Sequence, residues 1–330
     1  MKNLSMKSLA CGAVAGTAIT FIAIAANAAD TVSVRTDWFH SHYHSPFFLG
    51  MEKGFYREAG IELKPTEGRG SGQVVQLVGS GDDEFGFAST DAVFRAVAKG
   101  IPVIAVGNVM PKMGQAVYVL KKSGITRPEQ LKGKTIAMTP GGTNEALLPA
   151  FLKNVGLSMA DLRPITVSPA AKNRMFTEGK FDAVMSVAWA AGLFKAGGGT
   201  NSFVYSDYGV AMVGYNIVTR PEFAKANADV VRRFLKATMK AFAYSKRNQA
   251  EALDALAKHR PNHAKPERRE RNIGDMADAM KFVGAAVKGK AMGFQSERDW
   301  LATQALLLKY GVIKEKKPIS SYFTNAYVGG

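Results

Sequence analysis

The fold is decided by residues 31–64, which read TVSVRTDWFHSHYHSPFFLGMEKGFYREAGIELK. Residues 31–36 alternate apolar and polar side chains, which is typical of a β-strand. Residues 47–59 carry apolar side chains at helical spacing, and Gly60 marks the end of that helix. A second short strand follows at residues 61–64. A strand, a helix and a strand joined by short turns predict parallel strands covered by a helix.

The rest of the chain repeats this alternation in two blocks. Further strands are expected at residues 85–88, 101–106, 116–120, 134–138, 165–167, 181–187 and 210–219. Helices are expected at residues 73–78, 91–100, 143–156, 170–178, 222–258, 275–287 and 296–310. The last helix has a capping box formed by Ser296 and Asp299. The pattern predicts an α/β protein with two lobes, each a mostly parallel sheet flanked by helices, joined by two hinge strands.

The order of these blocks predicts a discontinuous first lobe. Residues 29–115 form its first part, residues 116–217 form the second lobe, and residues 218–330 return to the first lobe as a mainly helical segment. Because the chain crosses between the lobes twice, the two crossings act as a hinge. In such sheets ligands bind at the carboxyl ends of the strands, so the cleft between the lobes is the expected site.

Residues 1–28 have the features of a signal peptide. Two lysines precede an almost wholly apolar stretch at residues 9–26, and residues 26–28 (Ala-Asn-Ala) give the small-x-small pattern of a cleavage site. Cleavage is expected between Ala28 and Ala29, which places the mature protein in the periplasm. The alternative is an uncleaved anchor helix, for which the apolar stretch is short.

Cysteine usage excludes several kinds of chemistry. The single cysteine, Cys11, lies inside the expected signal peptide, so the mature chain has none. This excludes disulfides, thiolate metal sites, iron–sulfur clusters and cysteine nucleophiles. No segment after residue 30 is long and apolar enough to cross a bilayer.

The net charge is strongly positive, at +16 with a pI near 9.8. Such a balance suggests nucleic acid, but the basic residues are spread along the chain and an exported protein rarely meets nucleic acid. We therefore expect no nucleic-acid partner. The densest basic run, residues 260–271 (RPNHAKPERRER), contains two prolines and two glutamates and is expected to be a solvated loop.

Aromatic and histidine side chains gather directly after the first strand. Trp38, Phe39, His40 and His44 are expected to face the cleft, where aromatic faces suit a flat ring and imidazoles can hydrogen-bond to ring nitrogens or carboxylates. The alternative for Trp38 and Phe39 is a role in the core. His40, His42 and His44 would also lie on one side of an extended chain, as metal ligands could. They lack an evident fourth ligand, and we expect no metal site.

The starts of three expected helices offer backbone N–H groups and hydroxyls that suit a carboxylate, a phosphate or polar ring atoms. The candidate ligand-binding residues there are Ser71, Ser89, Asp91, Gly142, Thr143 and Asn144. Simple helix capping requires the same residue types and is the alternative for each of them.

Further candidates follow other strand ends. Trp189 could close over a ring from the side opposite Trp38, or could belong to the core, and Tyr215 on the returning strand is of the same kind. Glu67 and Asp91 would form an acidic pair that favours an amino-substituted or cationic heterocycle over a sulfonate. The alternative for each of the two alone is an exposed or capping carboxylate.

Several phrases resemble one known group of proteins. Asp37-Trp38, Tyr43-His44 and the phrase EKGFYREAG at residues 52–60 are typical of the opening of type II periplasmic solute-binding proteins of ABC importers. Shorter similarities lie at residues 79–81, 85–86, 131–134 and 179–183. The resemblance spans residues 32–250. It is closest to the branch of bacterial thiamine-pyrimidine-precursor binders and the fungal thiamine-pyrimidine synthase, which is related to sulfonate, taurine and nitrate binders.

The resemblance also implies an enzyme hypothesis. The fungal synthase holds pyridoxal phosphate on a lysine, consumes its own histidine four residues later, and uses iron with a cysteine-rich motif. His44 matches that histidine, but the lysine position is His40, which cannot form a Schiff base. A mature chain without cysteine also lacks the cysteine motif.

We therefore expect a binding protein without a cofactor rather than an enzyme. The resemblance implies a small solute, favoured as a flat heterocycle related to thiamine-pyrimidine precursors, with an aromatic carboxylate or sulfonate as the alternative. It also implies the permease and ATPase of an ABC importer as partners, and a monomer is expected. Hinge closure around the solute is the expected mechanism.

Overall fold

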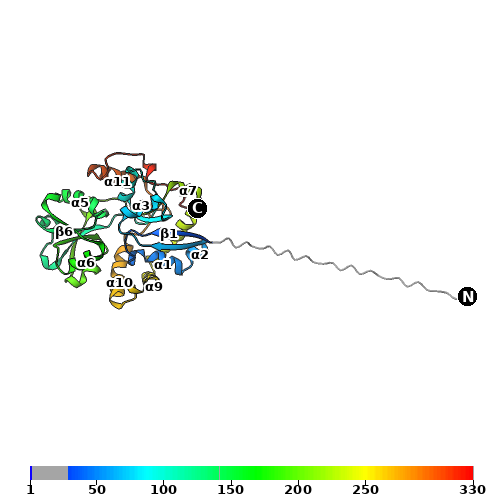
Figure 1. Cartoon of the computed structure of the whole chain (residues 1–330), viewed down its shortest axis with the longest axis horizontal. Helices are drawn as coiled ribbons and strands as arrows, with labels where there is room; N and C mark the ends of the chain where they lie inside the picture. Colours follow the sequence, from blue (N-terminus) through cyan, green and yellow to red (C-terminus); the bar gives the residue numbers. More distant parts are fainter. Residues whose placement is uncertain (2–28, 141, 330) are drawn as a thin grey trace.

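The computed structural model describes Met1, residues 29–140 and residues 142–329. Residues 2–28, which contain the expected signal peptide after Met1 and end at its cleavage site, lie outside the described residues. Two five-stranded sheets form the frame of the molecule, and Figure 1 shows the segment that contains β6, α5 and α6 as a separate body beside the rest. Within the described residues, no helix has both the length and the apolar character needed to span a membrane.

The first sheet combines four strands from residues 30–108 with one strand that returns at residues 215–219. Its strands are β1 (Asp30–Arg35), β2 (Ile61–Thr66), β3 (Phe85–Ser89), β4 (Ile104–Asn108) and β10 (Tyr215–Thr219), in the order β2-β1-β3-β10-β4. β1 is parallel to β2 and β3, whereas β10 is antiparallel to both β3 and β4. Four strands therefore share one direction and the returning strand opposes them.

The second sheet repeats this arrangement. Its strands are β5 (Gln115–Leu120), β6 (Thr135–Met138), β7 (Arg163–Thr166), β8 (Ala183–Val187) and β9 (Thr200–Val204), in the order β7-β6-β8-β5-β9. β5 is antiparallel to both of its neighbours, and the other strands share one direction. The expected fold of two mostly parallel sheets is thus confirmed. β9 was not expected from the sequence.

Helices flank both sheets. Around the first sheet they are α1 (Ser45–Glu52), α2 (Phe55–Glu58), α3 (Ser71–Ser80), α4 (Thr90–Ala98), α7 (Pro221–Ala226), α8 (Ala228–Ser245), α9 (Gln249–His259), α10 (Pro266–Met280) and α11 (Glu297–Lys309). The second sheet has α5 (Thr143–Asn154) and α6 (Pro169–Thr177). The single helix expected at residues 47–59 is two helices, because Gly54 adopts a left-handed conformation (φ 73°) between them. The expected cap of α11 is confirmed, since Ser296 accepts a hydrogen bond from the Asp299 N–H.

An aromatic core lies beneath the carboxyl ends of the first sheet. Phe87 on β3 is fully buried and stacks on Tyr215, with ring centroids 5.0 Å apart. Phe47 and Phe242 also contact Phe87, which joins α1 and α8 to the sheet. The ring of His44 meets Phe87 edge-on at 5.9 Å. This packing fixes the histidine-rich segment against a rigid base.

The chain crosses between the sheets in two segments that pair with each other. Gly214 N–H donates to the Met110 carbonyl (3.1 Å), and Met113 N–H donates to the Met212 carbonyl (2.9 Å). A Cβ atom on Gly214 would lie 2.4 Å from the Lys112 carbonyl oxygen, so the close approach of the two segments requires glycine. The lobe boundaries proposed from the sequence stay a prediction, and these pairings describe the junction next to them.

Candidate functional site

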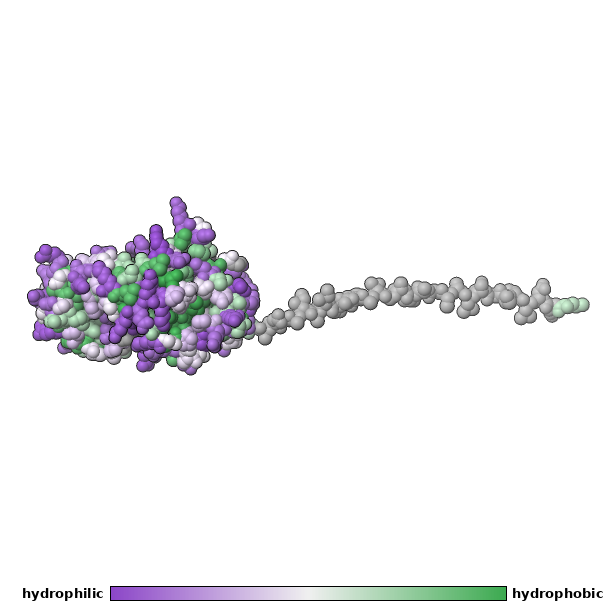
Figure 2. All heavy atoms as spheres, turned by 90° about the horizontal axis from the view of Figure 1, so that it is seen from above, coloured by the Kyte–Doolittle hydropathy of each residue, from purple (hydrophilic) through white to green (hydrophobic). Residues whose placement is uncertain are grey.

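A cavity of about 600 Å³ lies between the two sheets. On the side of the first sheet it is lined by residues 37–43, Glu67, Gly70, Ser71, Tyr215 and part of the segment 260–272. From the second sheet it receives Gln115, Thr139, residues 142–144, Ala170, Lys172, Asn173, residues 185–187, Ala190 and Leu193. Figure 2 shows one outer face of the molecule, on which hydrophilic residues lie with hydrophobic residues between them.

The structure brings most of the candidate residues to this cavity. Those in its lining are Trp38, Phe39, His40, Glu67, Ser71, Gly142, Thr143, Asn144 and Tyr215. Those that are not in its lining are His44, Ser89, Asp91 and Trp189. The four outside the lining are all fully buried, so they can act on the cavity only through the residues that they hold.

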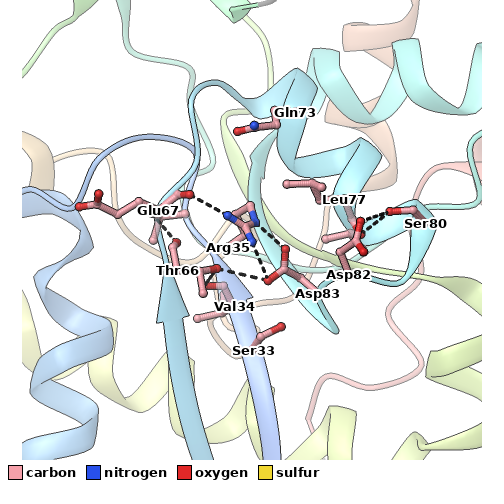
Figure 3. A network of polar contacts seen from close by, with 12 residues as sticks. Ser33, Val34, Arg35, Thr66, Glu67, Gln73, Leu77, Ser80, Asp82 and Asp83 are labelled. Carbon is pink, nitrogen blue, oxygen red and sulfur yellow. Dashed lines mark hydrogen bonds and ion pairs between the residues drawn. The ribbon is translucent and has the colours of Figure 1, made fainter. Parts of the chain in front are cut away.

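A polar network at the carboxyl end of β1 positions Glu67 (Figure 3). Arg35 pairs with Asp83 and donates from Nη1 to the Glu67 carbonyl (2.8 Å). Thr66 at the end of β2 donates to the same carboxylate of Asp83. These bonds fix the backbone of the loop, while the side chain of Glu67 extends to the other side and accepts from the His40 N–H (2.8 Å).

His44 is not in the cavity lining, but it contacts Asp37, which is. Its Nε2 is 2.8 Å from an oxygen of Asp37, and the Tyr43 hydroxyl donates to that carboxylate at 3.3 Å. The His44 side chain is fully buried. Burial, followed by the nearby charge of Asp37, raises the pKa of Tyr43 well above its ordinary value. The residue that matches the consumed histidine of the synthase therefore supports the cavity floor and does not line the cavity.

His40 and His42 are neutral and each presents a ring nitrogen without a partner. Burial lowers the pKa of both imidazoles to about 3, and the neighbouring His44 adds to the effect. Arg260 Nε donates to His40 Nδ1 (3.0 Å), so the proton of that ring resides on Nε2. In the described part of the chain, Nε2 of His40 and Nε2 of His42 have no hydrogen-bond partner. Polar ring atoms of a ligand could satisfy both.

The three candidate helix starts meet at one place. Ser89, before α4, bonds to Thr143 at the start of α5 with 2.6 Å between the hydroxyl oxygens, and Ser89 N–H donates to the Ser71 hydroxyl at the start of α3. The bond between Ser89 and Thr143 links the body of the first sheet to the body of the second. Thr143 and Ser71 line the cavity, whereas Ser89 holds them in place.

Trp189 joins the two bodies from a fully buried position. Its ring centroid lies 5.5 Å from that of Tyr43, 6.4 Å from that of Tyr215 and 5.0 Å from that of Phe282. These partners leave no face of the ring in the cavity lining. Tyr215 does line the cavity, and its hydroxyl accepts from Gln115 Nε2 at 3.1 Å.

The acidic pair expected from Glu67 and Asp91 does not form in the cavity. Asp91 is fully buried and accepts from Arg95 one helical turn later, at 2.9 Å from Nη2. Its charge is therefore neutralised inside the first sheet's body. Of the two, Glu67 lines the cavity and Asp91 does not, so the expected pair does not favour a cationic heterocycle there.

The prediction of a solvated loop at residues 260–271 is wrong. Residues from Pro266 onward form α10, and the proline occupies the first helical position, where its missing N–H costs no hydrogen bond. Arg260, Arg268 and Arg271 line the cavity. Burial lowers the pKa of Arg271, and its Nε has no hydrogen-bond partner among the described residues. The sequence signal that could have indicated this helix is the spacing of Arg268 and Arg271, which are three residues apart and therefore lie on one face of a helix.

Sequence reasoning also missed Lys172 on α6, which lines the cavity from the second sheet's side. The three histidines do not form the extended array considered as a metal site, because residues 42–44 form a 3-10 turn. Over residues 29–140 and 142–329, no group of three or more His, Cys, Asp or Glu side chains is placed to hold a metal ion.

Comparison with known proteins places the chain in a family. Residues 41–252 match the NMT1/THI5-like family. The chain is 28% identical over 229 residues to 4-amino-5-hydroxymethyl-2-methylpyrimidine phosphate synthase THI5 of Saccharomyces cerevisiae, covering 65% of this chain and 67% of that protein. The protein named as the same synthase in Legionella pneumophila is 21% identical over 301 residues, covering 90% and 92%.

Solved structures share the fold. The alkanesulfonate-binding protein SsuA from Xanthomonas axonopodis pv. citri, bound to MOPS, superposes with a TM-score of 0.70 at 19% identity, covering 89% of this chain and 98% of that one. This likeness establishes the periplasmic-binding-protein fold of the chain. Because the sequence match extends over residues 41–252, which is more than half of its length, the chain belongs to the NMT1/THI5-like family.

Proposed function

We propose that this protein is the exported solute-binding component of an ABC importer, and that it captures a small, flat, nitrogen-containing solute between its two bodies. The observation that carries this proposal is the cavity of about 600 Å³ lined from both sheets. That volume lies within the range of small-molecule sites. A cavity whose walls belong to two bodies joined by paired crossings favours capture by hinge closure.

The chemistry of the lining supports a flat heterocycle. Trp38 and Phe39 supply half-buried rings, with centroids 6.0 Å apart in an edge arrangement. Around them, Gln115 Oε1, Asn144 Oδ1 and Asn173 Oδ1 are buried without a hydrogen-bond partner in the described chain. Buried polar atoms without partners are costly, so a ligand with matching donors gains affinity by satisfying them.

The partners in this proposal are the permease and ATPase of the importer, with the periplasm as the location and the monomer as the working state. The fold is shared with a protein named as an alkanesulfonate-binding protein. Thiamine-pyrimidine precursors are the favoured solutes, because relatives are named as enzymes that make such a pyrimidine phosphate.

A synthase of the pyrimidine is the second candidate, and the names of these relatives favour it. The geometry of the residues that match its active site favours binding instead. His40 stands where the resemblance implies the lysine, and His44 is fully buried against Asp37, outside the cavity lining. A histidine in that position is not accessible to a bound cofactor.

A binding screen with chemical analysis of the recovered ligand tests the two candidates together. Purified protein is screened by thermal shift against pyrimidines, pyridoxal phosphate, aromatic acids and sulfonates, since a ligand that binds only the folded state raises the melting temperature. Hits are then titrated by calorimetry. We expect 1:1 binding and, by mass spectrometry, a ligand that is recovered unchanged. Conversion of pyridoxal phosphate together with a loss of mass at His44 would contradict the proposal.

A further inference from the structure

Lys172 is a buried lysine without a carboxylate partner. It lies on α6 and its exposed fraction is 7%. Its Nζ donates to the Met185 carbonyl at 2.9 Å, and within the described part of the chain the ammonium forms no ion pair. Buried charges in proteins are ordinarily paired, because removing a charge from water is expensive. An unpaired ammonium facing a cavity points to a partner that arrives with the ligand.

The ammonium of Lys172 lies over the ring of Trp38. The distance from Nζ to the ring centroid is 5.3 Å, which is the range of a cation–π contact. Lys172 belongs to the second sheet's body, whereas Trp38 follows β1 of the first sheet. The contact therefore spans the cavity from one body to the other. A flat ligand on Trp38 would come within reach of the ammonium.

Lys172 remains charged at neutral pH. Burial lowers its pKa from 10.5 to about 8, so about nine-tenths of the molecules carry the ammonium at pH 7. A buried lysine with a lowered pKa gains from an anionic neighbour, which restores the charged form.

The charges in the cavity lining do not balance. Its cationic residues are Lys172, Arg260, Arg268 and Arg271, and its acidic residues are Asp37 and Glu67. Asp37 is already bonded to His44 and Tyr43, and Glu67 accepts from a backbone N–H. The histidines His40 and His42 add no charge, because their pKa values lie near 3. The lining therefore carries an excess of two positive charges.

We propose that the ligand of this cavity carries an oxyanion, and that Lys172 binds this group while the flat part of the ligand packs against Trp38. This inference rests on the proposed function and names the class of its solute: a heterocyclic or aromatic carboxylate, sulfonate or phosphate ester. A neutral or cationic heterocycle leaves Lys172 without an ion-pair partner, so the cost of the buried charge favours an anion over it.

Matched pairs of probes test the need for an anion. Each pair shares a ring and differs in the charged group: pyridine-3-carboxylate with its carboxamide, pyridine-3-sulfonate with its sulfonamide, and pyridoxine 5′-phosphate with pyridoxine. Thermal shift and calorimetry at low salt give the affinity of each. We expect an anion to bind at least tenfold more tightly than its neutral partner, and the best pair identifies which oxyanion the site takes.

The variant Lys172→Met tests the residue itself. Methionine retains a flexible apolar chain but removes the ammonium, and we expect the affinity for the best anion to fall by about 10- to 100-fold. Lys172→Arg should restore part of that affinity. Lys180→Met, which removes an exposed lysine on the same body outside the cavity, should leave it unchanged.

A measurement without ligand separates this role from a structural one. If Lys172 is kept for the ligand, its removal relieves an unpaired buried charge, and the melting temperature of unliganded Lys172→Met should equal or exceed that of the wild type. A lower melting temperature with unchanged anion affinity overturns the proposal. So does a neutral or cationic probe that binds both proteins equally well, although solute binding itself then stands. A bound probe recovered as a different compound overturns the proposed function instead.

Discussion

Replacement of His42 by asparagine should make the stability of the protein less sensitive to acid between pH 6 and pH 4. The wild-type imidazole is buried, and its folded-state pKa is about 3 against an ordinary value of 6.5. A group with a lowered pKa contributes stability above pH 6.5 and loses that contribution as the pH falls toward 3. The positive charge of Arg271 acts on the same ring and does not titrate in this range.

The magnitude follows from the difference between the two pKa values. Each unit corresponds to about 1.4 kcal/mol, so His42 contributes a slope of about 1.4 kcal/mol per pH unit and about 5 kcal/mol over the whole range. Asparagine does not titrate, so the difference in free energy of unfolding between wild type and variant should change by about 1.4 kcal/mol for each unit from pH 6 to pH 4. The free energy of unfolding of the variant therefore rises relative to that of the wild type as the pH falls.

Urea unfolding followed by circular dichroism at pH 7, 6, 5 and 4 measures this difference. The unfolding free energy of each protein is obtained by linear extrapolation at each pH. Phe39→Leu is the matched control, because Phe39 also lines the cavity and does not titrate. Its curve should run parallel to that of the wild type. A constant difference between His42→Asn and wild type over this range would refute the argument from burial.

Three further changes test the cavity, the contact between the bodies and the crossing. Trp38→Ala should weaken binding of the best probe by about 1–3 kcal/mol by calorimetry, with an unchanged circular dichroism spectrum, and unchanged affinity would remove this ring from the site. Burial raises the pKa of Asp275 to about 6, so its contribution to stability is complete below pH 3.8 and lost as the pH rises through 6. Asp275→Asn keeps the acceptor for the Gly192 N–H and should remove about 3 kcal/mol of this pH dependence. The same urea series measures it, and a variant whose unfolding free energy changes with pH as steeply as that of the wild type would contradict the prediction. Gly214→Ala should destabilise by about 1–3 kcal/mol through contact with the facing carbonyls, whereas Gly274→Ala, in a helix with open space around it, should stabilise by up to about 1 kcal/mol; equal urea midpoints for the two would contradict the crossing geometry.

Much of the fold could be predicted because its strands are short, apolar and separated by clear turn residues. β3 reads FGFAS and is buried along its whole length, so it is recognisable without any long-range information. β9 reads TNSFV, is largely polar and lies at a sheet edge, and nothing local distinguishes it from a loop. The break between α1 and α2 depends on one left-handed glycine inside an otherwise helical pattern.

The part of the candidate site that directly follows a strand could be predicted from the sequence. Trp38 and His40 come directly after β1, and the rule that ligands bind at carboxyl ends of strands places them correctly in the lining. Arg268 and Arg271 reach the same cavity from a helix more than 200 residues later, and only the tertiary packing of α10 brings them there. Trp189 shows the opposite case, since an aromatic residue after a strand can equally fill the junction between two bodies.

The pairing of the two crossing segments has a consequence for how ligand specificity can be exchanged between relatives. Val109 N–H donates to the Tyr215 carbonyl at 3.0 Å, so the chain leaves the first body and re-enters it at nearly the same point. Residues 110–214 therefore form a continuous segment whose two ends are adjacent, which we call the cassette. Grafting a cassette from another member of the family would replace Lys172 and the rest of the second body's half of the cavity while leaving Trp38 and its surroundings intact. Exchange at two neighbouring junctions could thus combine one half-site with a different other half, provided that the incoming cassette keeps the buried contacts that Trp189 makes with Tyr43 and Phe282.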